Sequence, residues 1–148
     1  TNQSVSSQFT FDQAAAPDWT KGPANKTSLA LFSKDHDCFV SVDHKNGTVN
    51  ENAELQKITD MQTKGGYRVN SLQTQPLTLQ TQNGSQSYTL HTFSVTGEGS
   101  GGQLYGGQEF GYVQSADGYV AVSGYCNTAA QLAETITGLQ AINFDATK

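Results

Sequence analysis

The two cysteines of the 148-residue chain are the residues whose positions most directly suggest a chemical bond. Cys38 begins a short run in which every second residue is valine, and Cys126 ends a similar run. Because alternate residues of a strand lie on one face, both thiols are expected on the apolar side of a sheet. If the two strands are antiparallel neighbours, the sulfurs meet, and a disulfide stabilises the fold by about 4–5 kcal/mol on the chain-entropy model. The alternative is a pair of buried free thiols.

A second group with possible chemistry combines imidazoles and carboxylates: Asp35, His36, Asp37, Asp43 and His44. These are ligand types that bind Zn²⁺ and similar ions. Neighbouring strand residues point to opposite faces, however, and the stretch from Asp35 to Asp37 has the character of an ordinary polar turn. The turn also lacks the glycine and the closing glutamate of an EF-hand. We therefore expect no metal site; Asp35, Asp37 and His44 are the residues that would form one.

Residues 97–102 read Gly-Glu-Gly-Ser-Gly-Gly and match the GxGxxG pattern of dinucleotide sites. Such a site requires the glycine loop to open a helix whose first N–H groups face the pyrophosphate. Here the residues that follow predict another strand, so the segment is interpreted as a hairpin connection and no cofactor is expected.

Hydrolysis would need one of His36, His44 or His91 beside a serine and a carboxylate. No GxSxG nucleophile elbow is present, because Val122 and Ala121 precede Ser123. We predict that the chain is not an enzyme. A hydrolase that uses His91 is retained as the third hypothesis.

Two further features could contact a partner. Trp19, Tyr119 and Tyr125 could form an aromatic surface for a glycan or a peptide, although the same rings could simply cover the core. Residues 97–107 contain six glycines among eleven residues, which predicts a mobile loop. Leu104 and Tyr105 lie inside this loop and are its candidate contact residues; the alternative is an inert insertion.

The composition excludes some partners. The net charge is −5, the isoelectric point is near 4.9, and only eight residues are Lys or Arg, so no basic patch is available for nucleic acid. Ser, Thr, Asn and Gln together make up 54 residues, a polar uncharged surface often found in extracytoplasmic proteins. No apolar run approaches the roughly 18 residues that span a bilayer. The polar start at Thr1 suggests a mature protein without its signal or anchor, although a trimmed cytoplasmic protein would look the same.

The elements that position these residues are expected in one α+β domain, residues 28–148. A tether or loop over residues 1–27, in which residues 8–12 could form a short strand, precedes it and is expected to add little to the fold. Strands are expected at 29–32 and 38–43. Thr48 and Glu51 have capping-box spacing, with Asn50 as the alternative N-cap, and Leu55, Ile58 and Met61 follow, which predicts an amphipathic helix over 51–64. Antiparallel strands separated by turn signals fill 67–126, and a closing helix follows Thr128. The predicted order is β-β-α-β-β-β-β-α.

At this level of pattern the chain resembles the PsbP/Mog1/DcrB-like superfamily, which includes bacterial envelope lipoproteins. The opening strand pair 29–43, the helix 51–64, the long antiparallel meander and the ending at 119–144 carry the resemblance, which spans 29–145. The aromatic segment usual after the first strands is replaced here by 43–46, Asp-His-Lys-Asn. The resemblance implies an antiparallel sheet flanked by helices (an α-β-α sandwich) and a binding or assembly role rather than catalysis.

Three functions remain in consideration. The first is a non-catalytic extracytoplasmic domain, secreted or anchored in the cell envelope, that binds a protein, peptide or glycan as a monomer or weak oligomer. The second is a structural subunit of a surface assembly such as a pilus-like filament. The third is the hydrolase, which lacks any recognisable nucleophile motif.

Overall fold

The computed structural model of the chain describes residues 7–100 and 102–148. Strands account for most of the described residues, and two α-helices and a 3₁₀ helix complete the fold. The elements in chain order are β1 (Phe9–Phe11), β2 (Trp19–Ala24), β3 (Ser28–Ser33), β4 (Cys38–Lys45), α1 (Glu51–Lys64), β5 (Arg68–Thr81), β6 (Gly84–Gly99), β7 (Gly102–Ser115), β8 (Gly118–Cys126), the 3₁₀ helix η1 (Ala129–Glu134), α2 (Thr135–Gln140) and β9 (Ile142–Phe144).

All nine strands belong to one sheet, in the order β1-β9-β5-β6-β7-β8-β4-β3-β2. The long strands β5 to β8 form the expected antiparallel meander, and β8 continues into an antiparallel pair with β4. The sheet is nevertheless mixed, because β9 pairs in parallel with β5. The expected order β-β-α-β-β-β-β-α is also incomplete: β1, β2 and β9 are three additional short strands at the margins of the sheet.

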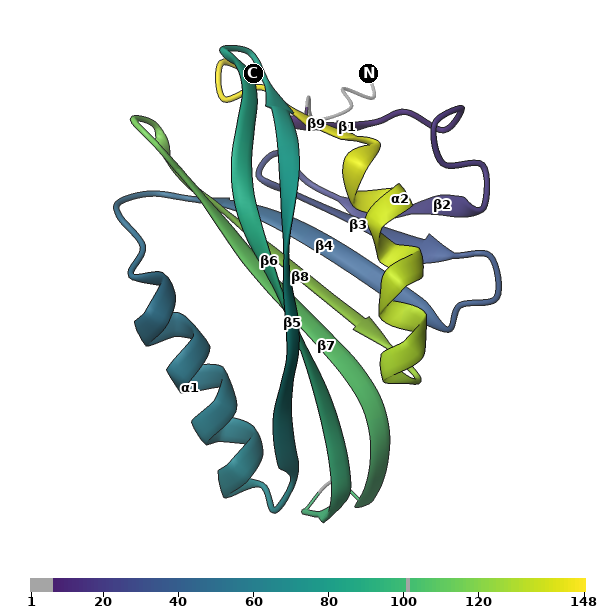
Figure 1. Cartoon of the computed structure of the whole chain (residues 1–148). Coiled ribbons are helices and arrows are strands. Elements are labelled where there is room, and N and C mark those ends of the chain that lie inside the picture. Colours follow the sequence, from purple (N-terminus) through teal and green to yellow (C-terminus); the bar gives the residue numbers. More distant parts are fainter. Residues whose placement is uncertain (1–6, 101) are drawn as a thin grey trace.

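The two α-helices lie on opposite faces of this sheet (Figure 1). His91 and Thr92 are adjacent on β6 and therefore point to opposite sides. The His91 imidazole contacts Glu51 of α1, whereas Thr92 pairs in register with Glu109, whose carboxylate lies beneath η1 and α2. The arrangement is thus helix, sheet, helix, and the face under η1 and α2 holds the main core.

The main core is built from alternate residues of the central strands. Val40 and Val42 of β4 and Val120 and Val122 of β8 are buried together, in the phase that the sequence predicts. The predicted disulfide is confirmed: Cys38 and Cys126 face each other across the β4–β8 pair and are bonded. Cys38 is the first residue of β4 and Cys126 is the last residue of β8, so the bond links these two strands at one end of their pairing.

Helix α1 begins where the sequence predicts, with Asn50 as N-cap accepting a hydrogen bond from Ala53 N. The predicted apolar stripe is not buried as expected: Leu55 and Ile58 are only partly covered, and Met61 is 68 % exposed. The helix is also tied to the sheet by polar contacts, including His91 Nε2 to Glu51 Oε1 at 3.1 Å. Helix α1 therefore lies on the outer face as a loosely packed cover.

The expectation that residues 1–27 form a tether with little part in the fold is wrong for the described segment; residues 1–6 lie outside it. Strand β1 pairs with β9, and β2 pairs with β3. Phe9 is buried against Phe144, with ring centroids 4.9 Å apart, and Trp19 is 3 % exposed beneath α2. A short strand at the edge of the sheet can be anchored by a single buried side chain, as Phe9 anchors β1 and Trp19 anchors β2.

The expected mobile loop over 97–107 is instead part of a β-hairpin. Strand β6 continues to Gly99, β7 begins at Gly102, and Gly97 pairs in register with Leu104. The glycines here serve close packing: a Cβ added to Gly106 would lie 2.8 Å from the Tyr125 ring, and one added to Gly107 would lie 2.7 Å from Leu132 Cδ1. Gly106 and Gly107 thus allow close approach of side chains to this hairpin, whereas mobility of residues 97–107 stays a prediction.

Replacing Trp19 with alanine tests whether the N-terminal segment belongs to the core. Trp19→Ala should lower the free energy of unfolding by about 3–5 kcal/mol, because it removes a buried indole and leaves a cavity under α2. Lys21→Ala, on the same strand but exposed, should change it by less than about 0.5 kcal/mol. Equilibrium urea unfolding measures both; equal and small effects would show that β2 is dispensable.

The disulfide makes a second prediction. Replacing both Cys38 and Cys126 with alanine should lower the free energy of unfolding by about 2–5 kcal/mol, since the bond closes a long loop in the unfolded chain. Before that experiment, the intact mass after alkylation without reductant should show no modified thiol. Two alkylated cysteines in protein made under oxidising conditions would contradict the assignment.

Candidate functional site

The feature of the core that the fold does not explain is Glu109, in the middle of β7. Its side chain points to the main core, between Thr92 of β6 and Gly124 of β8 in register. The residue is fully buried, and both carboxylate oxygens lack a hydrogen-bond partner among the described residues. An ionisable group in that condition costs stability, so its presence calls for an explanation other than folding.

The neighbouring strands make room for this side chain. A Cβ added to Gly124 would lie 2.8 Å from Glu109 Cγ and closer still to Oε1. Strand β8 carries Val120 and Val122 at the two preceding core positions and a glycine beside the carboxylate. The sheet therefore contains a recess fitted to Glu109.

Polar side chains near Glu109 are already committed to other acceptors. Thr92 Oγ1 donates to Gln73 O at 3.1 Å, and Thr135 Oγ1 donates to Leu132 O at 2.7 Å. The Thr135 hydroxyl lies near the carboxylate, but with its proton directed to Leu132 O it leaves the Glu109 oxygens unpaired. In this geometry neither Glu109 oxygen accepts a hydrogen bond from the described residues, and only a rotation of the Thr135 hydroxyl could supply one.

Burial raises the pKa of Glu109 from 4.5 to about 7, and the nearby Thr135 side chain opposes part of that rise. Burial, followed by the charge of Glu109, also holds the pKa of Tyr88 well above its usual range. At neutral pH the Glu109 carboxyl is thus divided between its acid and its carboxylate, so it can donate or accept a proton or a hydrogen bond.

A cavity of about 280 Å³ opens above Glu109, between the sheet and the closing helical segment. Its sheet side is formed by β5, β6 and β7, and the polar side chains there are Gln73, Gln75, Thr92 and Glu109. Its helical side is entirely apolar: Ala129, Ala130, Leu132, Ala133 and Ile136. Glu109 is the only titratable residue among these described lining residues.

The entrance to this cavity coincides with a β-bulge. The register between β5 and β6 shifts between Ser71 and Gln73, which leaves Leu72 without a partner on β6. Leu72 is 49 % exposed and lines the cavity, as do the exposed Ala130 and Ala133 on the helical side. Bulges of this kind are common beside functional sites because they redirect side chains and interrupt pairing.

The residues expected to form an aromatic surface do not meet. Trp19 is buried under Gly138 of α2 on the core side of the sheet, so it is excluded. Tyr125 is on the outer face, where its ring centroid is 5.9 Å from that of Phe39, which is 42 % exposed. These two rings and Phe110 line a shallow groove of about 390 Å³ on the outer face. Tyr119 shares that face at the far end of β8 but does not line the groove.

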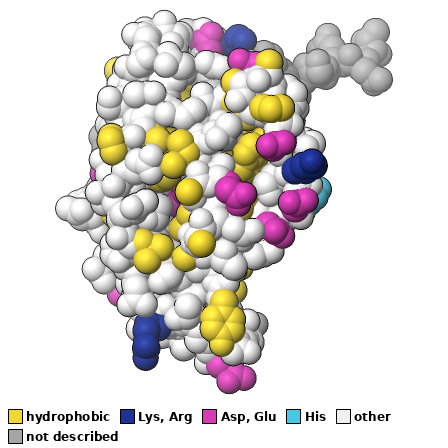
Figure 2. Space-filling model, turned by 45° about the vertical axis from the view of Figure 1, so that its right-hand side comes forward, with side chains coloured by type: hydrophobic (Ala, Val, Ile, Leu, Met, Phe, Trp, Pro, Cys, Tyr) yellow, Lys and Arg dark blue, Asp and Glu magenta, His cyan; other side chains and the backbone are white. Residues whose placement is uncertain are grey.

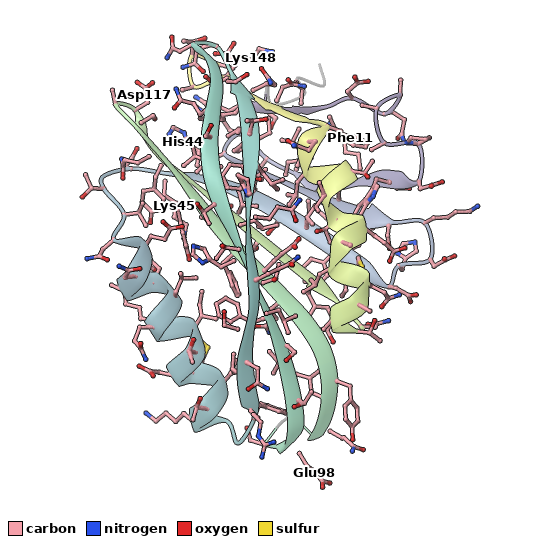
Figure 3. The ribbon with its side chains drawn as sticks, in the orientation of Figure 1. Phe11, His44, Lys45, Glu98, Asp117 and Lys148 are labelled. Carbon is pink, nitrogen blue, oxygen red and sulfur yellow. A yellow bond between two sulfur atoms is a disulfide. The ribbon has the colours of Figure 1, made fainter. Side chains whose placement is uncertain are left out.

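The metal candidates also lie apart. Asp37, at the start of β4, accepts hydrogen bonds from Asn127 Nδ2 and Gln131 Nε2 and ties β4 to η1. His44, near the other end of β4, contacts Gln8 Oε1 at 2.8 Å and Asp117 O at 2.9 Å, and Figure 3 shows His44 and Asp117 near the same end of the sheet. No three His, Cys, Asp or Glu side chains in the described part of the chain form a metal-binding group.

The remaining candidate residues are His91, Leu104 and Tyr105, and none of them lines the cavity above Glu109. His91 contacts Glu51 of α1 on the outer face. Tyr105 is 61 % exposed and Leu104 is half-buried, in the hairpin whose tip carries Glu98, at the end of the sheet opposite His44 (Figure 3). No helix in residues 7–100 and 102–148 combines the length and the apolar character needed to cross a bilayer.

The comparisons with known proteins bear on the fold. No family model and no curated protein sequence matches the chain. Among solved structures, the chain is similar to the solution structure of cyanobacterial PsbP (CyanoP) from Synechocystis sp. PCC 6803, with a TM-score of 0.50 and 11 % sequence identity. The match covers 93 % of this chain and 91 % of that chain.

The chain has a PsbP-like fold. The similarity confirms the resemblance that the order of elements predicts. At 11 % identity it concerns the fold alone, so no residue role is carried over to this PsbP-like chain.

Sequence reasoning did not single out Glu109. In β7 the large apolar side chains Phe110 and Tyr112 occupy the phase opposite to Glu109, so the strand taken alone places Glu109 on the outer face. Only the burial of its phase in the structure reveals it. A charged residue in the inward phase of a central strand indicates either a paired charge or a functional group.

The raised pKa of Glu109 predicts how stability depends on pH. Because the unfolded carboxyl loses its proton first as the pH rises, the free energy of unfolding should fall from about pH 4.5 to pH 7 and then level off. The contribution of this one group is about 3 kcal/mol. Glu109→Gln should remove it, so the variant should gain about that much relative to the unmodified chain between pH 4.5 and pH 8.

Urea unfolding at pH 4.5, 6 and 8 measures this change. Glu134→Gln, which removes an exposed carboxylate at the end of η1, is the matched control. Parallel stability curves for Glu109→Gln and the unmodified chain would contradict the assignment of a raised pKa to Glu109.

Proposed function

We propose that this chain is a non-catalytic extracytoplasmic binding domain that takes a small ligand into the cavity above Glu109. The observation that carries the proposal is the fully buried Glu109 carboxylate, which has no hydrogen-bond partner in the described part of the chain. A group that costs stability and takes part in no described hydrogen bond is expected to serve a ligand.

Binding is favoured over catalysis by the rest of the cavity. A carboxyl with a pKa of about 7 would suit acid–base chemistry, but such chemistry needs a second reactive group within reach. The other described lining residues are apolar, or carry amides and one hydroxyl. Of the described residues at the cavity, Glu109 alone offers a titratable group.

The extracytoplasmic setting is supported by the Cys38–Cys126 bond, because stable disulfides form and persist in oxidising compartments. The PsbP-like fold is compatible with a binding role. The surface is rich in uncharged polar groups, and the face shown in Figure 2 is mostly white with acidic side chains gathered on one side.

A second candidate function is partner binding through the outer aromatic groove, formed by Phe39, Phe110 and Tyr125. The exposure of Phe39 favours it, because a large apolar side chain at the surface of a sheet is a common recognition element. The two functions use opposite faces of the sheet, so an experiment that locates binding separates them.

Amide chemical-shift mapping with a panel of small anionic, neutral and cationic organic molecules tests the proposal. Binders should shift the amides of Leu72, Thr92, Gly124 and Ala133. Ala133→Trp should weaken this binding at least tenfold, because Ala133 is exposed at the entrance and an indole can cover the opening. Ala116→Trp, in the exposed β7–β8 turn, is the control and should leave binding unchanged.

Shifts confined to Phe39, Phe110 and Tyr125 would favour the second candidate instead. Binding at the cavity amides that is unaffected by Ala133→Trp would contradict the proposed entrance.

A further inference from the structure

We propose that the ligand of this cavity is an organic ammonium ion with an apolar chain, whose nitrogen supplies the hydrogen-bond donors that Glu109 lacks. This inference rests on the proposed function and adds the chemical class of the ligand.

The acceptors at the Glu109 end of the cavity match an ammonium group. Glu109 presents two oxygens without donors, and Thr92, directly opposite in register, has already given its proton to Gln73 O and can only accept. An ammonium ion has three donors and no acceptor, so three acceptor oxygens suit it. Hydrogen bonds between ionised groups are also about twice as strong as neutral ones, which favours a cation over an alcohol.

Other cations fit this site less well. A calcium or magnesium ion requires about six oxygen ligands, whereas the cavity contains one carboxylate. A guanidinium ion is planar with five donors in a fixed fork and needs acceptors all around its edge. The Glu109 oxygens are buried, and the space left at Gly124 is filled by the Glu109 side chain itself, so a compact cationic group is better suited to reach the carboxylate than a wide one.

The apolar wall supplies the other half of the recognition. Three alanines, Leu132 and Ile136 face the sheet across a space of about 280 Å³, and a water molecule occupies about 30 Å³ in the liquid. An alkyl chain of several carbons fits in that space and replaces water against apolar side chains. The charged end then lies at Glu109 and the chain extends toward the exposed entrance at Leu72.

A ligand can reach Glu109 only if a covering segment moves, because the Glu109 oxygens have no contact with solvent. The segment above them is η1, a 3₁₀ helix whose hydrogen-bond geometry is weaker than that of an α-helix. Leu132 of η1 packs on Gly107, where the absence of a Cβ leaves the leucine in direct contact with the backbone. A small shift of η1 therefore uncovers the carboxylate while the sheet stays unchanged.

The charges that face Glu109 permit a bound cation. Tyr88 of β6 is the titratable neighbour, and it stays neutral because burial raises its pKa further above the working range. Gly124 of β8, Thr135 of α2 and the described cavity residues of β5 and η1 carry no charge. The net charge of −5 also attracts cations toward the molecule.

Isothermal titration of the whole chain with n-hexylammonium, 1-hexanol and hexanoate at pH 5.5 and pH 8 tests the inference. Hexylammonium should bind most tightly at pH 8 and about 30-fold more weakly at pH 5.5, where a carboxyl with a pKa of about 7 is mostly protonated. At pH 5.5, titrations in buffers of different ionisation enthalpy should show the release of nearly one proton per bound ligand. Glu109→Gln should weaken binding at pH 8 by about tenfold or more and abolish the pH dependence, whereas Glu134→Gln should do neither.

Equal affinity for hexanol and hexylammonium at pH 8, lost in Ala133→Trp, would overturn the ammonium assignment while leaving the cavity as a binding site. Tighter binding of hexanoate, or hexylammonium binding that survives Glu109→Gln unchanged, would also overturn it. Hexylammonium binding that is equally strong in Ala133→Trp would overturn both the ligand class and the site. No binding of any of the three probes would overturn the ammonium assignment.

Discussion

The register between β6, β7 and β8 is the constraint on which the rest of this structure depends. Side chains alternate between two faces, so a slip of one residue would move Glu109 from the core to the outer face and bring Phe110 inward. The bond between Cys38 and Cys126 holds β8 in register with β4, and Gly107 lies directly opposite Cys126 on β7. The positions of the disulfide and of the space that holds the Glu109 carboxylate are thus both set by the pairing of β8 with its two neighbours, β4 and β7.

Glycine determines where other groups can approach this sheet. Gly124 leaves space for the carboxylate, Gly107 for Leu132 of η1, and Gly111 for the ring of Tyr88. On the other face Gly106 lies under the ring of Tyr125. A sheet with this many missing side chains brings helices and rings closer to its backbone than an ordinary pleated surface allows, and this closeness seals Glu109 from solvent.

Local patterns in the sequence predicted what is locally determined. Strand alternation placed both cysteines inward, and the cap at Asn50 fixed the start of α1. A possible strand at 8–12 was visible in the sequence, but its part in the core was missed because Phe9 is buried by Phe144, near the other end of the chain, and no local pattern contains that contact. Glu109 was missed for a related reason: the large apolar residues of β7 lie in the opposite phase, and the contact between this strand and the predicted closing helix is not contained in any local pattern.

Strands β1 and β9, the first and last strands of the described chain, lie side by side. Phe9 pairs with Phe144 in an antiparallel ladder, Asp145 N donates to Gln8 O, and Gln8 Nε2 donates to the carbonyl oxygens of Ala146 and Lys148. A mechanical load applied between the two ends therefore pulls these hydrogen bonds apart one after another, as in a zipper, and not all at once in shear. The domain is accordingly built to yield first at β1 and β9 under tension, while the β4–β8 pair remains joined by its covalent bond.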